Sequence, residues 1–494
     1  MRALISTYDK HGLEGFARGL ADLGVELVTT GGTTETYLRE LGLDPTSIEV
    51  PQMLGGRVKT LHPRVHAGIL ARRDKDEDVA ALEEHGIHAL DLVVVNVYPF
   101  TSDPGVELID IGGPTMLRAA AKNFAHVAAV CDPDDYEPVL EEIRTQGEVS
   151  AETRRRLAAK VFATTSAYDA AVTQWLGGGA GLPEQLTASF SKELDLAYGE
   201  NPHQQAAYYK GPGEHLLTDV EKLHGRELSF INLYDLAAAL SLLVELGDEP
   251  ACVIVKHANP CGAAVAGTIE EAYELAYGGD PLSAFGMVVA LNRPVSAKLG
   301  EALAQRFIDV LYAPEYEPAA LDALQRKPDT RILRGPVRDC GGLDAKRVPG
   351  GMLVQQPDFL LEGRDEVELV CGSLDDAGWR DLMFAWTVCK HVTSNAIVLA
   401  RNRQAIGIGA GQQSRVDSVR LAVEKAKERG HDLEGAVLAS DAFFPFADGP
   451  QLGLEAGVGA VIQPGGSKRD SEVIEAVEAA GAAMVFTHHR HFKH

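Results

Sequence analysis

The sequence predicts an α/β protein of several domains, in which parallel sheets are covered by helices on both faces. Two observations lead to this prediction. Short apolar runs, typical of buried strands, alternate with helical segments along nearly the whole chain. The chain is 494 residues long, a length that corresponds to about two to four domains.

The elements of the first half follow one another in a regular order. We expect strands at residues 3–5, 25–28, 92–97 and 127–130, and helices at 13–23, 33–41, 114–123 and 152–176. Gly24 and Gly42 close the first two helices, and Pro114 stands where the third begins. The glycine-rich run 177–183 is the best linker candidate, so we place a first domain at 1–185.

Residues 186–494 show the same alternation of strands and helices. Strand-like runs lie at 252–255, 287–291, 308–313, 395–399, 405–408, 436–439, 459–462 and 483–487, with helical runs at 296–306, 375–389, 415–429 and 469–480. This part could form one large domain or two of about 150 residues. Lys-His occurs at 256–257 and again at 390–391, each time beside an apolar strand, which is weak support for two related subdomains.

The composition narrows the classes of protein. The apolar fraction of 45% and the charged fraction of 24% are those of an ordinary soluble protein. A net charge of −25 argues against nucleic-acid and membrane partners, although a local cluster of cations could still bind an anionic small molecule. We expect no transmembrane helix and no signal peptide, and the six cysteines without paired spacing fit a cytoplasmic protein.

The strongest candidate for chemistry is Val-Lys-His-Ala-Asn-Pro-Cys-Gly at 255–262. An apolar strand delivers Lys256 and His257 side by side, and we expect residues 259–262 to turn the chain toward a helix. Strand ends often carry reacting groups in α/β proteins, where His can move a proton and Lys can stabilise an anion. The alternative is a solvated pair at a strand terminus.

Two glycine-rich segments of the first half are candidates for phosphate binding. Gly-Gly-Arg-Val-Lys-Thr-Leu-His-Pro at 55–63 places Arg57 and Lys59 beside backbone that a ligand can approach. Residues 30–33 precede a helix whose N–H groups could bind a phosphate, although a Gly-Gly turn also occurs there for geometric reasons alone.

Other polar side chains of the first half have two interpretations each. Asn96 and Tyr98 follow a strand, where ligands bind in such sheets, but Tyr98 could be a structural aromatic residue. Asp110 precedes Gly-Gly. Lys122 ends a helix, and a lone lysine there usually complements the helix dipole.

Two cofactor classes are rejected. Residues 406–415 contain several glycines without the GxGxxG spacing, and no acidic residue stands about twenty residues further on after another strand, so we expect no NAD. Pro260-Cys261 is similar to part of a zinc deaminase motif, but position 264 is Ala and no His-x-Glu occurs. We therefore expect no metal.

Together these segments resemble one family over essentially the whole chain: the bifunctional AICAR formyltransferase/IMP cyclohydrolases of purine biosynthesis. The resemblance is carried by residues 55–63, 109–113 (Ile-Asp-Ile-Gly-Gly), 118–123 (Arg-Ala-Ala-Ala-Lys-Asn), 199–204 (Gly-Glu-Asn-Pro-His-Gln), 256–262, 409–415 (Gly-Ala-Gly-Gln-Gln-Ser-Arg) and 440–446 (Ser-Asp-Ala-Phe-Phe-Pro-Phe). It implies an N-terminal methylglyoxal-synthase-like domain with a parallel sheet. It also implies a C-terminal domain, 186–494, of two cytidine-deaminase-like α/β subdomains with a boundary near residue 365.

The resemblance implies two sequential reactions. A formyl group passes from 10-formyltetrahydrofolate, the co-substrate, to the amine of AICAR, and formyl-AICAR then closes to IMP with loss of water. For the transfer it implies His257 as general base, Lys256 as the stabiliser of the oxyanion and Asn395 as the residue that orients substrate and base. The implied AICAR contacts are Tyr198, Gly286, Asp309, Arg415, Phe443 and Arg490, and the implied folate contacts are Val416 and Asp448.

For the cyclisation the resemblance implies proton transfer by Lys122 with help from Tyr98 and Asp110. The implied substrate contacts are Asp9, Lys10, Thr30, Gly31, Gly32, Thr33, Arg57, Val58, Lys59, Thr60, Asn96 and Ile111. It also implies a homodimer whose formyltransferase sites are shared between subunits, and no metal.

The chain departs from the family pattern in three places. Ala197 stands where the family commonly has Arg, Tyr8 stands where it usually has Ser, and the segment 44–53 is shorter than usual. Two other functions stay open: a methylglyoxal-synthase-like lyase, which leaves some three hundred residues unexplained, and a nucleotide sensor without turnover.

Overall fold

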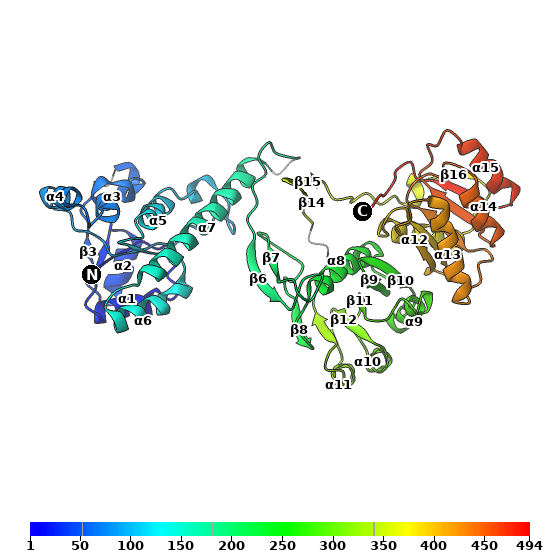
Figure 1. The fold of residues 1–494 in the computed structure, drawn as a ribbon, viewed down its shortest axis with the longest axis horizontal. Coiled ribbons are helices and arrows are strands. Elements are labelled where there is room, and N and C mark those ends of the chain that lie inside the picture. Colours follow the sequence, from blue (N-terminus) through cyan, green and yellow to red (C-terminus); the bar gives the residue numbers. More distant parts are fainter. Residues whose placement is uncertain (52, 179–180, 339–340) are drawn as a thin grey trace. The chain divides into compact units, whose positions relative to one another are not determined.

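The computed structural model describes residues 1–51, 53–178, 181–338 and 341–494 (Figure 1). The chain folds as two compact units, Met1–Phe190 and Ser191–His494. Gly179 and Ala180 of the predicted linker, one residue of the shortened segment 44–53, and Cys340 lie outside the described residues. Within the described ranges, the helices are all too short or too polar to span a membrane.

The first unit is built on a five-stranded sheet in which every neighbouring pair is parallel. The order is β3 (Thr46–Ser47), β2 (Glu26–Thr29), β1 (Arg2–Ile5), β4 (Leu92–Val94) and β5 (Ala128–Val130). The helices are α1 (Leu13–Asp22), α2 (Thr33–Glu40), α3 (Pro63–Leu70), α4 (Asp76–Glu84), α5 (Gly112–Lys122), α6 (Tyr136–Gln146) and α7 (Ala151–Leu176). The α/β fold predicted from the alternation is confirmed.

Both faces of this sheet are buried. Alternate residues of one strand point to opposite faces, so Ala3 and Ile5 pack with α1 and α6, while Leu4 packs with α3 and α5. Because β1, β2 and β4 are parallel, their carboxyl ends meet at one edge of the sheet. The loops that follow these strands carry the polar segments singled out in the sequence.

The second unit contains a mixed sheet of twelve strands. Its order is β16 (Glu368–Cys371), β21 (Ala483–Phe486), β20 (Ala460–Gln463), β19 (Val437–Ser440), β17 (Ile397–Arg401), β18 (Gln404–Gly409), β10 (Asn259–Val265), β9 (Ala251–Lys256), β11 (Met287–Leu291), β12 (Ile308–Ala313), β13 (Arg331–Arg334) and β8 (Glu221–His224). Two small hairpins pair β6 (Ser191–Leu196) with β7 (Ala206–Lys210) and β14 (Asp344–Val348) with β15 (Gly351–Gln355).

Two copies of one arrangement make up this sheet. The first copy runs α8 (Phe230–Glu245), β9, β10, α9 (Ile269–Gly279), β11, α10 (Ala297–Ala304), β12, α11 (Pro318–Leu324) and β13. The second runs α12 (Asp376–Lys390), β17, β18, α13 (Arg415–Glu428), β19, α14 (Asp448–Glu455), β20, α15 (Asp470–Ala479) and β21. In both, the first strand is antiparallel to its two neighbours and the later pairs are parallel. The copies join where Ala264 of β10 pairs with Gln404 of β18.

The equivalence of the copies extends to their hairpin turns. Residues 257–258 and residues 402–403 all have φ between 53° and 59°, as in the tight turns that match the twist of a hairpin. Asp235 of α8 accepts hydrogen bonds from both N–H groups of the first turn, and Asp381 of α12 does the same for the second. The repeat is therefore visible in individual side chains.

Three expectations from the sequence were wrong. Residues 259–262 begin strand β10 instead of turning toward a helix, because the chain already reverses at 257–258. The sheet is mixed, since this hairpin makes β9 antiparallel to both neighbours. Lys390 and His391 are not the counterparts of the first Lys-His pair, because they end α12 and both contact Glu245.

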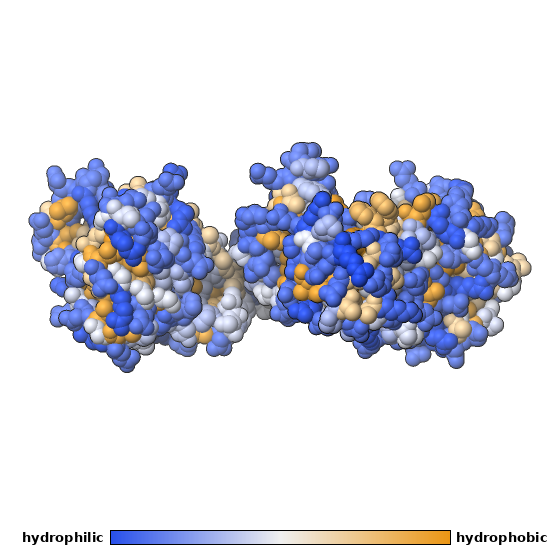
Figure 2. Space-filling view, turned by 90° about the horizontal axis from the view of Figure 1, so that it is seen from below, coloured by the Kyte–Doolittle hydropathy of each residue, from blue (hydrophilic) through white to orange (hydrophobic). Residues whose placement is uncertain are grey.

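The helices divide between the two faces of the large sheet. Residues of α8 and α12 form one core that is shared by both copies. The other face has a separate core for each copy, with α9 to α11 over the first and α13 and α15 over the second (Figure 1). The face seen in Figure 2 is mostly hydrophilic, with hydrophobic residues in small patches. The boundary near 365 falls in a short 3₁₀ turn, Arg364–Glu366, and stays a prediction.

Two candidate active sites

The first unit has a cavity of about 500 Å³ at the carboxyl edge of its sheet. Loops after β1, β2 and β4, the segment 56–60 and the start of α5 line it. The predicted residues that line it are Gly31, Thr33, Arg57, Lys59, Thr60, Asn96, Tyr98, Asp110 and Ile111. Asp9, Lys10, Thr30, Gly32 and Val58 lie within two residues of lining positions. Ligands of open α/β sheets bind at this edge.

Lys59 is held against the glycine turn before α2. Its Nζ donates to the carbonyl oxygen of Gly31 over 3.1 Å, and a Cβ on Gly32 would lie 2.5 Å from that nitrogen. Burial lowers the pKa of Lys59, and nearby Glu35 opposes the shift. The turn with φ of 80° and 86° thus brings a partly desolvated ammonium beside the start of a helix.

Asp110 and Tyr98, both in the segment 95–111 that follows β4, line this cavity. Asp110 accepts a hydrogen bond of 2.9 Å from the Gly113 N–H, and burial raises the pKa of its carboxyl group. Burial, followed by the charge of Asp110, raises the pKa of Tyr98. Both shifts are toward the protonated form. The Tyr98 hydroxyl can donate a hydrogen bond, and the Asp110 carboxyl group lines the same cavity.

Tyr8, which the resemblance marks as unusual, forms part of the cavity wall. Its ring lies 5.1 Å from the ring of Tyr98, centroid to centroid. Asn96 holds this loop, because its Oδ1 accepts from the N–H groups of Tyr8 and Asp9 over 2.6 and 3.2 Å. Lys10 donates to Thr34 over 3.2 Å, and burial lowers its pKa despite the opposing charge of Asp9.

Lys122 is separate from this cavity. It is exposed at the C-terminal end of α5, whereas Gly112 at the other end lines the cavity. Ten residues of helix correspond to about 15 Å. This geometry favours the helix-dipole interpretation of Lys122, and its role in proton transfer stays a prediction.

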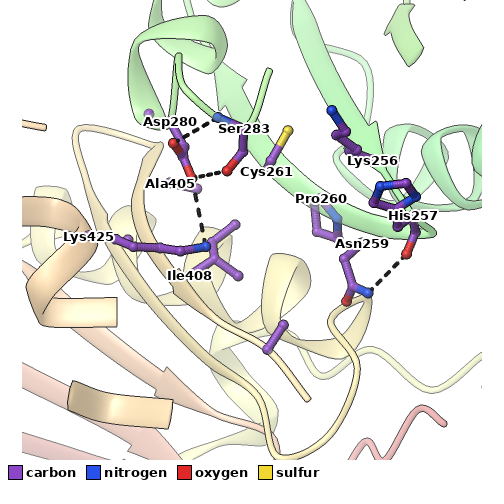
Figure 3. A pocket seen from close by; sticks show the side chains of 13 residues that line it. Lys256, His257, Asn259, Pro260, Cys261, Asp280, Ser283, Ala405, Ile408 and Lys425 are labelled. Atoms are coloured by element: carbon purple, nitrogen blue, oxygen red, sulfur yellow. Dashed lines mark hydrogen bonds and ion pairs between the residues drawn. The ribbon is translucent and has the colours of Figure 1, made fainter. Parts of the chain in front are cut away.

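In the second unit, Lys256 and His257 lie at the β9–β10 turn and line a small cavity of about 170 Å³ (Figure 3). Lys256 Nζ donates to the Phe285 carbonyl oxygen and lies 5.9 Å from the centre of that ring. Asn259 secures the turn, because it donates to the His257 carbonyl oxygen over 3.2 Å and accepts from the Thr393 N–H over 2.9 Å.

Cys261 lines the same small cavity, and burial raises the pKa of its thiol to about 12. Asp280, across the cavity in Figure 3, accepts hydrogen bonds from the Ser283 hydroxyl and from the guanidinium of Arg429. Among the residues that the structure describes, no cluster of three or more His, Cys, Asp or Glu side chains could hold a metal ion.

A second cavity of about 520 Å³ lies beside the start of α13. The predicted residues that line it are Asn395, Arg415, Val416, Phe443, Asp448 and Arg490, which we call the Asn-Arg group. Asn395 Oδ1 accepts from Arg415 Nη2 over 2.7 Å, and Arg415 Nη1 donates to Ser440 over 2.8 Å and to Asp441. Arg415 is buried, and these hydrogen bonds hold its planar guanidinium in one orientation.

Lys256, His257, Gly286 and Asp309, which we call the Lys-His group, share a sheet edge with the Asn-Arg group. Gly286 has a φ of 64°, and a Cβ there would lie 3.9 Å from Asp309 Oδ1. Because β10 is antiparallel to β18, the start of β10 lies beside the end of β18, next to Asn395. Tyr198 is not among the residues that line these two cavities; it lies in the chain between β6 and β7, where its carbonyl oxygen accepts from the Phe230 N–H at the start of α8.

Sequence reasoning missed residues that hold the candidate side chains in place. Asp235 fixes the turn that carries His257, and Asp441 fixes the guanidinium of Arg415. Each is more than twenty positions from its partner, and spacing carries no sign of such a contact. Asp441 lies in a segment that the resemblance had singled out, which is the one signal that could have found it.

The fold and these cavities define a two-unit α/β protein with a separate polar ligand site in each unit. An MGS-like domain model matches residues 12–120, and a model described as AICARFT/IMPCHase bienzyme matches residues 120–425. The chain is 46% identical over 515 residues to the bifunctional purine biosynthesis protein PurH of Halalkalibacterium halodurans, covering 100% of this chain and 99% of the relative. The same coverage holds for the proteins of that name from Acidithiobacillus ferrooxidans and Chlorobium luteolum, each 48% identical.

A solved structure titled "Crystal structure of ForH" is 40% identical over 36% of this chain and 99% of that chain, with a TM-score of 0.33. The full-length relatives and the family model place the chain: it belongs to the AICARFT/IMPCHase bienzyme family. The resemblance stated from the sequence is confirmed.

Proposed function

We propose that each of the two sites carries one of the last two steps of purine biosynthesis. The chain is a bifunctional AICAR formyltransferase and IMP cyclohydrolase. The observation that carries the assignment of the transferase site is the buried Asn395–Arg415 pair, which lines one cavity with Phe443 and Arg490 on the same sheet edge as Lys256 and His257.

In the formyl transfer, the 5-amino group of AICAR attacks the formyl carbon. His257 takes the proton that this amine loses, and Lys256 stabilises the oxygen that becomes negative. The new C–N bond forms as the bond to the folate nitrogen breaks, and that nitrogen takes up a proton. Arg415 and Arg490 bind the anionic nucleotide, while Asn395 orients it.

The Asn-Arg cavity also has a wall that suits the folate co-substrate, which supplies the formyl group. Phe443 and Phe446 are 40% and 49% exposed and line the cavity, so a flat heterocycle can stack there. Val416 and Asp448 would contact its ring, one through apolar packing and the other through hydrogen bonds to ring N–H groups. No metal takes part in either proposed step.

In the cyclisation, the carboxamide nitrogen of formyl-AICAR attacks the formyl carbon and water leaves. The Tyr98 phenol can donate to the departing oxygen. The Asp110 carboxyl group, whose pKa burial raises, lines the same cavity and assists the proton transfer. Arg57, Lys59 and the N–H groups at residues 31–33 would hold the phosphate. Tyr8 adds an aromatic wall that packs beside Tyr98.

We also propose a homodimer whose formyltransferase sites are shared between the subunits. Large apolar side chains are exposed in the second unit: Leu282 and Phe285 near Lys256 are 74% and 64% exposed, and Leu353 and Phe359 are each 63% exposed. Such patches mark interaction surfaces. The five described cysteines are free, which supports a reducing, cytoplasmic location.

The test is to incubate the protein with AICAR and 10-formyltetrahydrofolate and to follow tetrahydrofolate and IMP. Release of both products is expected. Tetrahydrofolate at background level would contradict the transferase assignment, and binding of AICAR without any turnover would favour a nucleotide sensor. Release of methylglyoxal from a triose phosphate by the same protein would favour the lyase alternative.

A further inference from the structure

The last residues of the chain, 487–494, form a segment that we call the terminal segment. It follows β21 and carries Arg490 into the cavity of the Asn-Arg group. The Arg490 guanidinium lies over the ring of Phe492, 4.5 Å from its centre. The residues on either side, His489 and His491, contact acidic side chains of residues 358–362 instead.

Glu362 is the centre of these contacts. Its side chain is only 3% exposed, and its Oε2 accepts a hydrogen bond of 2.9 Å from Trp386 Nε1 of α12. The same oxygen lies 3.2 Å from His491 Nε2, while Oε1 lies 3.1 Å from His489 Nδ1. A buried carboxylate with three nitrogen partners is well compensated, and the loss of its charge would leave several of them without an acceptor of equal strength.

His491 has a carboxylate at each ring nitrogen. Besides Glu362, it meets Asp358, whose Oδ2 lies 2.6 Å from Nδ1. Both nitrogens can donate only when the ring is protonated, so this geometry is that of an imidazolium. The backbone N–H of His491 donates to the carbonyl oxygen of Asp441 over 3.0 Å. The Asp441 side chain in turn forms an ion pair with Arg415.

We propose that Asp358, Glu362 and His491 are positioning residues that fix the terminal segment so that Arg490 points into the nucleotide cavity. They touch no substrate themselves and act through Arg490 and, by way of Asp441, through Arg415. The inference rests on the proposed function in one respect, namely that Arg490 contacts AICAR.

The charges of this cluster make the arrangement sensitive to pH. Burial lowers the pKa of His491, but the hydrogen bonds that its ring donates to Glu362 and Asp358 outweigh this effect, and the net shift is upward. Burial opposes the charge of Glu362, yet its bonds to His491 and Trp386 hold its pKa at about 2. The cluster is therefore intact below the raised pKa of His491 and weakens as the pH rises through it.

The experiment measures the dissociation constant of AICAR calorimetrically, between pH 6 and pH 9, for the full chain without folate. Glu362→Gln should weaken binding by about tenfold at the lower pH values. Asp358→Asn removes a more exposed partner and should move the rise of the dissociation constant to lower pH. His488→Asn is the matched control, because it changes an exposed histidine of the same segment whose φ of 62° asparagine tolerates.

The results separate the claims. If the wild type does not bind AICAR, the proposed function and this inference both fail. If it binds AICAR and both cluster variants match the wild type at every pH, as His488→Asn should, the positioning role is contradicted. Thermal unfolding identifies variants that do not fold, and should Glu362→Gln be one of them, the pH shift of Asp358→Asn decides.

Discussion

Arg415 Nη2 donates a hydrogen bond of 2.7 Å to Asn395 Oδ1, which joins the start of α13 to the chain just before β17. The other guanidinium nitrogen, Nη1, is held by Ser440 and Asp441. The carboxamide and the guanidinium are thereby oriented before any ligand binds, and such preorganisation favours specific recognition of an anionic nucleotide.

Arg415→Lys should reduce kcat/KM for AICAR in formyl transfer by about 100-fold, equivalent to about 2.7 kcal/mol. A lysine keeps the charge but cannot span Asn395 and Asp441 at once. The measurement is tetrahydrofolate release at varied AICAR concentration. Arg420→Lys, on the exposed side of the same helix, is the control and should stay close to wild type. Equal activity of the two variants would show that the fork has no role.

The duplicated turn contacts allow a second comparison. Asp235→Asn and Asp381→Asn each leave one turn N–H without its carboxylate oxygen, so each should lower the free energy of unfolding by about 1–3 kcal/mol. Only the first turn carries Lys256 and His257, so only Asp235→Asn should also slow formyl transfer, by about tenfold. Equal loss of activity in both variants would mean that stability alone, and not the position of the turn, is at stake.

Gly32 tests the phosphate loop. In Gly32→Ala the new methyl group would meet Lys59 Nζ, whereas Gly42→Ala, at a similar positive φ, has no atom within 4 Å of its Cβ. Backbone strain costs about 1–3 kcal/mol in Gly32→Ala, whose φ of 86° and ψ of −157° are almost restricted to glycine, and about 1–2 kcal/mol in Gly42→Ala; thermal unfolding reports both. The affinity for IMP should fall only in Gly32→Ala, because only there is the ammonium displaced. Unchanged IMP affinity in that variant would remove Lys59 from the binding site.

Most elements of the fold were predictable because their signals are local. Apolar periodicity and caps located the strand at 308–313 and the helix at 415–428 almost to the residue. The hairpin at 257–258 was not, since His257-Ala258 is not one of the usual hairpin turn sequences, such as Asn-Gly or Asp-Gly. Asp235, far along the chain, stabilises that turn. Long-range pairs of this kind, including Glu362 with His491, depend on tertiary contacts that no spacing encodes.

Some residues of the candidate sites could be predicted from local sequence, and others could not. Residues after strands, such as Asn96 and Tyr98, were expected at the ligand edge and lie there. The resemblance supplied those of the Asn-Arg group, which the structure brings to one cavity. For Lys122 the motif and the geometry give different expectations, because a motif gives no information on which end of a helix faces the ligand.

Variants at Lys122 and Asp110 test whether the motif or the cavity geometry identifies the group that transfers the proton in cyclisation. Lys122→Gln should leave cyclisation of supplied formyl-AICAR within about twofold of wild type, whereas Asp110→Asn should slow it by more than about tenfold. The reason is that Asp110 lines the cavity and Lys122 does not. IMP formation followed by absorbance gives both rates. A large loss in Lys122→Gln, with an unchanged melting temperature, would instead support proton transfer by that lysine.

The central claim is that formyl transfer and cyclisation occur at separate sites and that Lys256 serves the first. The most direct measurement is a single assay of Lys256→Ala that follows tetrahydrofolate release from 10-formyltetrahydrofolate with AICAR, and IMP formation from supplied formyl-AICAR. We predict tetrahydrofolate at background level together with wild-type cyclisation. Loss of both activities in a folded Lys256→Ala protein, or wild-type formyl transfer, would contradict the account.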